Sequence, residues 1–569
     1  MNLELLNCNN KFTSEFLVAE AKCLTITEDK FDGTKYFINS NNKTMQLKFK
    51  RYFLLSAIFF STISLHIQAQ GSYLSGDFHQ HTTYTDGGFS FGHMMRKNAE
   101  FGLDWWANSE HGGRSSRWAT VSGRDLGTTV TWNNVNGITL EGTRDPENPN
   151  DMWRWQVLRD FSFKDVQLFR EVLPHKIILQ GVEWNAPGYE HVNVCIIDNQ
   201  FDSTNPNCNP VAEFEYKFDN GDRDVSEPNG WIKSKKEGKE KTIEAIEWMQ
   251  KNYPKTSWIV PTHPERSNRL KIEDIRNMNN AGPDVCFGFD SQPGHQKSKN
   301  RGGYRPTSYG ATGERENDGA TWGGTGIFAA KIGGVWDALL SEGRKWWLFA
   351  NSDCHGENSD FYPGEYQKTK IFVKERSAQG VVDGLRSGNS YIVTGDLIDS
   401  LKFTVGTATI GETFHTNGKS VTIKIIVRDP DKNNHNTYSS FTNPVLDHID
   451  IIAGIVTGKI DPQDPRYSHD EVFTTKVIAR FGKKTHIDAN GIKTQLWKDL
   501  GNGIKEITFT TNVDSDMYFR LRGTHHSFED KNSEIDQYGN PILDVFGTNN
   551  AAKAFEDLWF YSNPVFVKK

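Results

Sequence analysis

Histidine and carboxylate side chains recur in five short clusters along this chain, and these residue types are suited to holding metal ions. The clusters contain nine candidate ligands: His79, His81, Asp86, His111, Glu183, His191, His263, Asp353 and His355. In an extended segment residues i and i+2 point to the same side, so His79 and His81 can hold one ion together. Neutral imidazole and carboxylate suit divalent zinc, manganese or iron. Nine ligands are too many for one tetrahedral ion, so we expect two or three ions that share carboxylates.

The alternative is that these histidines are ordinary surface or core residues, which is the usual role of an isolated histidine. The chain has 17 histidines, and some of them would fall close together by accident. Five clusters that combine histidine with a carboxylate favour a metal centre over this alternative.

Three of the candidate ligands end short apolar runs, which predicts that strands position them. The runs are 177–183 ending on Glu183, 256–263 ending on His263, and 346–353 ending on Asp353. Between them, residues 241–251 and 333–343 have the apolar spacing of helices. Strands that alternate with helices and each end on a polar ligand are typical of a barrel with its site at the carboxyl ends of the strands.

The order of these motifs resembles the PHP (polymerase and histidinol phosphatase) superfamily over residues 73–395. The matching motifs are His-x-His at 79–81, an acidic residue at Asp86, Glu-His at 110–111, and Asp-x-His at 353–355, with Glu183, His191 and His263 between them. The resemblance implies an α/β fold, a distorted barrel of seven βα units, with a two- or three-metal site and phosphoesterase activity.

The resemblance also implies a distribution of ligands among three metal ions. His79, His81, Glu183 and Asp353 would hold the first ion, and Glu183 would bridge to a second ion that also takes His191 and His263. Asp86, His111 and His355 would hold a third. Ions about 3.5–4 Å apart lower the pKa of a bridging water, and the hydroxide formed would attack a phosphate ester.

Three residues are candidates for a direct part in catalysis. His191 would belong to the second metal, and Glu110, next to His111, would serve in proton transfer. Arg266 lies three residues beyond His263, so it must be near the site, where a guanidinium would bind an anionic substrate. It belongs to a Gly-rich basic insertion, 264–330, which with 114–175 would shape the substrate pocket. The insertion 114–175 would contain an aromatic helix from Met152 to Leu173. The alternative for most of the basic residues in 264–330 is a solvated surface loop.

Length and composition predict two domains in a folded protein. A chain of 569 residues is too long for one ordinary core, and 36% of its residues are hydrophobic. From about residue 400 to 569, short runs with partial alternation, such as 421–425 and 518–521, predict an all-β sandwich after the barrel. The net charge of −7 gives no electrostatic reason to expect nucleic acid as a partner.

The N-terminal region predicts export. Lys48, Lys50 and Arg51 precede an apolar run from 52 to 65, which is typical of a secretory signal peptide at 45–69. Residues 1–44 would then be an upstream extension from a wrongly assigned start. The mature protein would be periplasmic or secreted, with no stable membrane span after cleavage. An uncleaved membrane anchor is the alternative.

The favoured function is an exported metal-dependent phosphoesterase that acts on a small phosphate mono- or diester. The substrate would be a small molecule or derived from an oligosaccharide, and anionic. One alternative keeps the metals but hydrolyses an amide, a lactone or a sugar-derived ester during use of extracellular polysaccharide. Another is a non-catalytic protein whose sandwich binds glycan. Cationic side chains around an open metal face would favour phosphate.

Overall fold

The computed structural model describes residues 71–569, apart from 118–130, 201–208, 299, 312–320, 431–433, 441, 530–534 and 541–550. All elements below belong to one compact unit, Ala69–Lys569. The predicted signal peptide and upstream extension lie outside the described residues. In the part that is described, no helix is long and apolar enough to cross a membrane.

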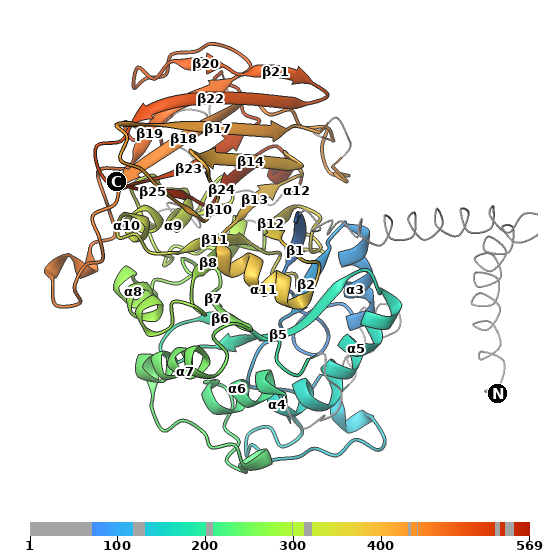
Figure 1. The fold of residues 1–569 in the computed structure, drawn as a ribbon. Coiled ribbons are helices and arrows are strands. Elements are labelled where there is room, and N and C mark those ends of the chain that lie inside the picture. Colours follow the sequence, from blue (N-terminus) through green and yellow to red (C-terminus); the bar gives the residue numbers. More distant parts are fainter. Residues whose placement is uncertain are drawn as a thin grey trace, which may run out of the picture. The chain divides into compact units, whose positions relative to one another are not determined.

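The sheet that carries the candidate ligands contains a run of parallel strands (Figure 1). β1 (Ser72–Asp77) pairs with β2 (Trp105–Asn108), and β2 pairs with β5 (Ile177–Asn185), in both cases in parallel. β6 (His191–Ile196) then runs antiparallel to both β5 and β7 (Ser257–Pro261). The loop between β5 and β6 is short, and only antiparallel strands can be joined without a long crossover. The expected alternation of strand and helix is therefore interrupted here by a hairpin.

Two further parallel strands, β8 (Gly288–Gln292) and β11 (Trp347–Ala350), form a pair of their own. Isolated bridges join them to the main sheet, Thr262 with Asp290 beyond β7 and Gln80 with Cys354 beyond β1. These contacts lead from β1 through the other six strands and back to the segment after β1. Continuous ladders do not close the ring, so the distorted barrel of seven βα units stays a prediction, whereas the mixed α/β sheet is observed.

Helices flank these strands, and two of them were predicted. The run 241–251 lies within α7 (Gly238–Asn252), and 333–343 contains α10 (Val335–Ser341). Further helices include α3 (Phe91–Glu100), α6 (Pro210–Phe218), α8 (Ile272–Ala281), α9 (Ile327–Ala330) and α11 (Ala378–Ser387). α11 shows why such segments start and stop where they do. The Ser377 hydroxyl accepts a hydrogen bond from the Gly380 N–H, and Gly388 ends the helix with a φ of +70°.

The continuous helix expected from Met152 to Leu173 is broken in two ways. β4 (Met152–Trp153) pairs with β3 (Arg114–Ser115), which removes the first two residues. Between α4 (Arg154–Val157) and α5 (Phe163–Val172) the chain forms a π-helix, η2 (Leu158–Ser162). Gln180 Nε2 donates a hydrogen bond of 2.8 Å to the Leu158 carbonyl oxygen, which satisfies an acceptor within the wider turn.

Beyond residue 400 the strands form two layers. One is a five-stranded sheet of β14 (Ser400–Val405), β15 (Ala408–Thr409), β17 (Ser420–Arg428), β21 (Lys498–Gly501) and β22 (Ile504–Asn512). The other contains β18 (His448–Ile455), β19 (Lys476–Gly482), β20 (Thr494–Leu496), β23 (Met517–Thr524), β24 (Trp559–Ser562) and β25 (Val565–Lys568), with β16 (Thr413–His415) at its side. Phe403, Ile425, Ile451 and Leu521 share one buried core, so the C-terminal region is the expected β-rich layer pair.

The second of these layers continues into the sheet that carries the candidate ligands. β24 pairs with β13 (Ser390–Thr394), β13 pairs with β12 (Gln367–Val373), and β12 pairs with β1. The sheet therefore runs through the position of the expected domain boundary near residue 400, and that boundary stays a prediction. Two short strands, β24 and β25, lie near the C-terminus.

A buried ion pair also joins the C-terminal region to the rest. Asp337 in α10 accepts hydrogen bonds from Arg520 Nε at 2.9 Å and Nη2 at 2.7 Å, and from the Tyr518 hydroxyl at 3.0 Å. Both charged side chains are fully buried. Removal of one partner leaves the other charge buried and uncompensated, so it lowers the stability of the folded protein strongly.

We therefore expect Asp337→Ala to lower the free energy of unfolding by about 3–5 kcal/mol. The measurement is the urea midpoint and slope of purified protein. Asp464→Ala is the matched control, because the Asp464–Arg466 pair lies at the surface, with Arg466 68% exposed. Equal midpoints for the two variants would contradict this account of Asp337.

Candidate metal centre

The carboxylate of Glu183, near the end of β5, lies at the middle of the candidate ligands. Among the described residues, five imidazoles contact it. Its Oε1 lies 3.0 Å from His79 Nε2, 3.1 Å from His191 Nδ1 and 3.2 Å from His263 Nε2. Its Oε2 lies 3.2 Å from His81 Nε2 and 2.9 Å from His111 Nδ1. One buried carboxylate thus gathers histidines from four separate stretches of the chain.

Asp353 faces the same histidines from the other side. Its Oδ1 lies 3.1 Å from His79 Nε2, 3.3 Å from His81 Nε2 and 3.5 Å from His355 Nδ1. His79, His81, Glu183 and Asp353 are all buried, and their ligand atoms lie within 4.8 Å of one another. These are the four residues expected to hold the first metal ion.

A second group lies on the side that solvent reaches. Asp86 Oδ2 is 3.3 Å from His111 Nε2 and 3.4 Å from His355 Nε2, and Asp86 is 56% exposed. With His81 these residues form another set of ligand atoms within 4.8 Å. The structure therefore brings together the three residues expected at a third ion. His191 and His263 meet at Glu183 Oε1, as expected for the second, although the compact set of ligand atoms at this position joins Glu183 and His191 with His111.

Backbone contacts between two strand ends hold His79, His81 and Asp353 in place. The Asp353 N–H donates to the His79 carbonyl at 2.8 Å, and the His81 N–H donates to the Cys354 carbonyl at 3.1 Å. Asp77, at the end of β1, accepts from the His79 N–H at 2.9 Å and the Ser352 N–H at 2.7 Å. The segments after β1 and after β11 are thus joined along the ligands that they carry.

Strained backbone accompanies the site. His263 has a φ of +33°, Asp353 of +45° and His295 of +57°. Positive φ is uncommon for residues with a side chain, and it costs on the order of 1–3 kcal/mol at each position. Such conformations persist only where the surrounding contacts impose them, and they cluster at functional sites.

The donor set fits divalent cations. Several buried atoms here have no hydrogen-bond partner of acceptable geometry: His79 Nε2, both ring nitrogens of His81, His111 Nδ1, His263 Nδ1 and Glu183 Oε2. An unsatisfied buried polar atom costs about 1–3 kcal/mol. Imidazole lone pairs that converge on shared carboxylates remove this cost when they bind a cation. Clustered histidine and carboxylate groups with unsatisfied donor atoms therefore point to a metal centre.

Protonation equilibria at the site differ from one histidine to another. Burial and the charge of Arg266 lower the pKa of His263 to about 4, so this ring stays neutral and able to bind metal. Burial alone would lower the pKa of His355, but its hydrogen bond to Asp86 and the charge of Asp353 outweigh burial and raise it to about 9. His355 is therefore protonated near neutral pH when no metal is bound.

Two residues at the site were not predicted from the sequence. Asp290, in β8, lies with its Oδ2 3.4 Å from His79 Nδ1 and so orients this ring, as carboxylates commonly do for histidine ligands. Its signal was an apolar run, 285–289, that ends on a carboxylate. His295 Nε2 lies 3.4 Å from Asp353 Oδ2. His295 belongs to the insertion 264–330, whose basic residues, and not its histidine, were expected near the substrate.

The three proposed catalytic residues have different surroundings. His191 contacts Glu183 and is 29% exposed. Arg266 donates from Nη1 and Nη2 to Asp353 Oδ2, both at 3.0 Å, so its guanidinium holds a candidate ligand. Glu110 is buried and accepts hydrogen bonds from the Thr82 N–H at 3.2 Å and from the Thr82 and Thr85 hydroxyls. Glu110 thereby shapes the loop between His81 and Asp86, and the catalytic roles of all three stay predictions.

Several basic residues of the insertion 264–330 are less accessible to an anionic substrate than the sequence indicated. Lys297 and Arg301 are buried, with side-chain partners described below. Arg269 and Arg305 are exposed, and Lys299 and Arg315 lie outside the described residues.

The segment 88–92 fits the Gly-x-Ser-x-Gly pattern of serine hydrolases. Its Ser90 is buried and is the N-cap of α3, where its hydroxyl accepts a hydrogen bond of 3.3 Å from the His93 N–H. Nucleophilic elbows connect a strand directly to a helix and expose the hydroxyl. β1 ends at Asp77, well before α3, so Ser90 does not connect a strand directly to a helix. Its hydroxyl is also buried rather than exposed.

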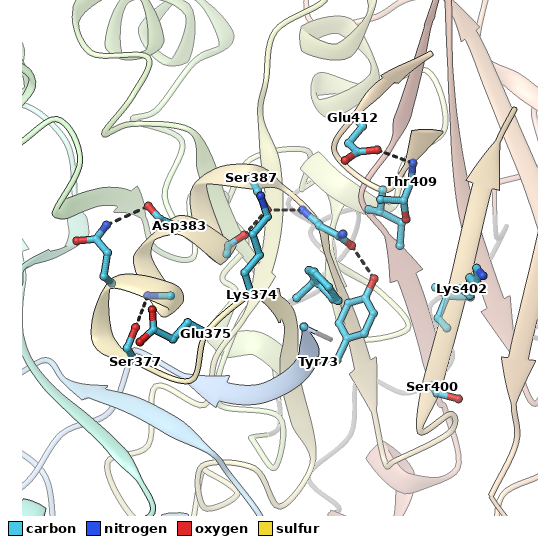
Figure 2. Close-up of a pocket in the computed structure, with 18 of the residues that line it drawn as sticks. Tyr73, Lys374, Glu375, Ser377, Asp383, Ser387, Ser400, Lys402, Thr409 and Glu412 are labelled. Carbon is cyan, nitrogen blue, oxygen red and sulfur yellow. Dashed lines mark hydrogen bonds between the residues drawn. The ribbon is translucent and has the colours of Figure 1, made fainter. Parts of the chain in front are cut away.

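A cavity of about 890 Å³ lies away from the candidate ligands. It is lined by residues of β1, β12, α11 and β14, including Tyr73, Asp383 and Lys402, and by Lys374, which follows β12 (Figure 2). None of the nine candidate ligands lines it. Both acidic and basic side chains line this cavity, so its charge does not indicate which class of ligand it would bind.

No family model matches the chain, and no curated protein matches it. A solved structure from Bacteroides vulgatus, that of a two-domain protein containing a predicted PHP-like metal-dependent phosphoesterase, is similar to it. The two are 13% identical, the match covers 79% of this chain and 90% of that chain, and the TM-score is 0.31. A likeness this distant does not indicate what this protein does, and its function is inferred from the residues of the site instead.

We expect metal binding near pH 7.5 to release protons. His355, whose pKa is raised to about 9, must lose its proton to become a ligand, so metal affinity should rise with pH up to about that value. Calorimetric titration in two buffers of different ionisation enthalpy measures the protons released. His355→Asn should release fewer, and an identical count for this variant and the natural protein would refute the assignment.

Asp290→Asn should weaken metal affinity or turnover about 10–100-fold, because the carboxylate that orients His79 is lost while its shape is kept. Metal content after dialysis and initial rates are the measurements. Asp383→Asn, at an exposed site in α11, serves as the control. Equal behaviour of the two variants would show that Asp290 has no part in the centre.

Proposed function

We propose that this protein is a metal-dependent phosphoesterase of the PHP type that is exported from the cell. One observation carries the proposal: five imidazoles and a second carboxylate converge on Glu183, with Asp86, His111 and His355 at an accessible edge. The motif resemblance over residues 73–395 supports the same reading. Export rests on the signal peptide expected at 45–69.

The residues divide into two sets according to depth. His79, His81, Glu183, His263 and Asp353 are buried and would hold the inner part of the centre, whereas Asp86, His111, His191 and His355 would complete it where substrate arrives. Bound divalent cations supply Lewis acidity, which activates water and neutralises charge on a phosphoryl oxygen. We propose two or three such ions, of zinc, manganese or iron.

The side chains around these residues fix their orientation. Asp290 sets the His79 ring, and Arg266 together with His295 sets Asp353. Burial of Glu183 and Asp353 excludes water from the inner side, which strengthens their interaction with any cation bound there. A substrate therefore meets a rigid, polar surface at its accessible edge, and this suits an anionic substrate of small size.

A second candidate keeps the centre and changes the bond that is hydrolysed to an amide, a lactone or a sugar-derived ester. It is favoured by the pairing of Arg266 with Asp353, because the cation expected to mark a phosphate substrate is already occupied. Of the two, phosphate ester hydrolysis remains our proposal, because it is the activity that the motif order implies.

A hydrolysis screen of the protein from residue 70 onward, with added manganese, zinc or iron, tests this function. We expect metal-dependent release from a phosphate mono- or diester, lost in His79→Ala and Asp353→Ala together with bound metal, since these strand-end ligands contribute little to the core. His415→Ala, at an exposed position, is the control.

Activity on carboxylic esters, lactones or amides alone would replace the phosphoesterase with the second candidate. Full phosphatase activity in His79→Ala, or activity that survives complete chelation of metal, would overturn the proposed centre.

A further inference from the structure

The loop after β8, residues 293–303, brings His295 to the candidate metal centre. The His295 Nδ1 is hydrogen-bonded to Asp360, and its Nε2 lies 3.4 Å from Asp353 Oδ2. Asp360 also accepts hydrogen bonds from the backbone N–H groups of His355 at 2.7 Å and Gly356 at 3.0 Å. His295 is therefore tied to the segment that carries two candidate ligands.

His295 acts on Asp353 rather than holding an ion of its own. The ring nitrogens of His295 and His355 and a carboxylate oxygen of Asp353 lie within 4.8 Å of one another, which would suit a cation. However, His355 Nδ1 lies 2.9 Å from the Asp353 carbonyl oxygen, an acceptor that is satisfied when this nitrogen carries a proton, so it would not also offer a lone pair to an ion between His295 and Asp353. Arg266 already places a positive charge on Asp353 Oδ2, which would repel a cation there.

The same loop is anchored to the C-terminal region by Arg301, whose guanidinium is buried. Its Nη1 donates to Asp557 Oδ2 at 2.5 Å, its Nη2 to the Tyr366 hydroxyl at 2.6 Å, and its Nε to Gln296 Oε1 at 2.8 Å. Gln296 is the neighbour of His295 in sequence. One side chain thus connects Asp557 to the residue next to His295.

Asp557 is fixed from the C-terminal side. Its Oδ1 contacts His526 Nε2 at 2.7 Å and accepts a hydrogen bond from Trp559 Nε1 at 2.8 Å. Trp559 begins β24, which pairs with both β13 and β23. A second anchor is Lys297, which donates to the Tyr438 hydroxyl at 2.9 Å. The loop is held by the C-terminal region at both of these points.

From this continuous path of contacts, we propose that the C-terminal region sets the geometry of the metal centre through Asp557, Arg301 and His295. Asp557 and His295 are then positioning residues, which act through Asp353. This inference rests on the proposed metal centre, and it assigns the C-terminal region a role in the site rather than in separate ligand binding.

A double-mutant cycle between Asp557→Asn and His295→Ala tests the path. Titration of metal-free protein with Co²⁺, followed by visible absorption, measures affinity independently of turnover. We expect each single variant to weaken Co²⁺ affinity about 10-fold or more, and the double variant to be no weaker than the worse single one. Non-additivity is expected because both changes release the same contact with Asp353.

Asp337→Asn is the control, because it breaks another buried ion pair between the same two regions away from His295. Asp337→Asn should lower the melting temperature. Its effect on Co²⁺ affinity should add to that of His295→Ala. If Asp557→Asn fails to fold, Trp559→Phe removes one hydrogen bond to Asp557 and keeps the aromatic packing.

Additive effects of Asp557→Asn and His295→Ala on Co²⁺ affinity would overturn the inference. A lower melting temperature of Asp557→Asn with unchanged Co²⁺ affinity would overturn it as well. Failure of the natural protein to bind Co²⁺ would overturn it together with the metal centre. Coupling in Co²⁺ affinity without hydrolysis of any phosphate ester would support the inference while refuting the proposed function.

Discussion

The burial of Glu183 among five imidazoles is the interaction on which the rest of the site depends. A buried carboxylate is costly unless cations or hydrogen bonds compensate it. Burial alone would raise the pKa of Glu183, but the charges of His191 and His79 hold it well below its ordinary value. The neighbouring carboxylates raise the pKa of His79 and of His111, so protons on these two rings supply compensation without metal, and a bound cation would replace them. Protons and metal therefore compete for the same set of side chains.

The strand ends provide the rigidity that such a cluster needs. The segments that follow β1 and β11 are hydrogen-bonded through their backbones, so His79, His81 and Asp353 cannot move independently. Asp77 reinforces this junction by accepting hydrogen bonds from both segments. Asp290 orients His79, and Arg266 holds Asp353. Positive φ at His263 and Asp353 shows that the fold imposes these positions at a cost to the backbone.

The C-terminal region shares its sheet with the strands of the site, so hydrogen-bonded strands connect the two regions. β24 pairs with β13, and buried pairs such as Arg520–Asp337 and Arg301–Asp557 cross between the regions. Ion pairs of this kind are costly to break and geometrically specific. They are therefore well suited to hold a loop such as 293–303 in one position.

The sequence by itself determined the ligand types, their order and several elements that carry them. Glu183 and His263 end or follow strands as their apolar runs indicated, and α7 and α10 form where helical spacing was found. Such signals are local, because they depend on side-chain periodicity within one element. The nine candidate ligands also meet, although their grouping around particular ions stays a prediction.

Only the tertiary structure decided how distant segments meet. The π-helix near Leu158 and the pairing of β13 with β24 depend on partners far along the chain. The same holds for Arg266, which pairs with Asp353, and for His295, whose role follows from Asp360 and Asp353. Contacts between residues this far apart leave no periodic signal in either segment, because packing rather than local propensity selects them.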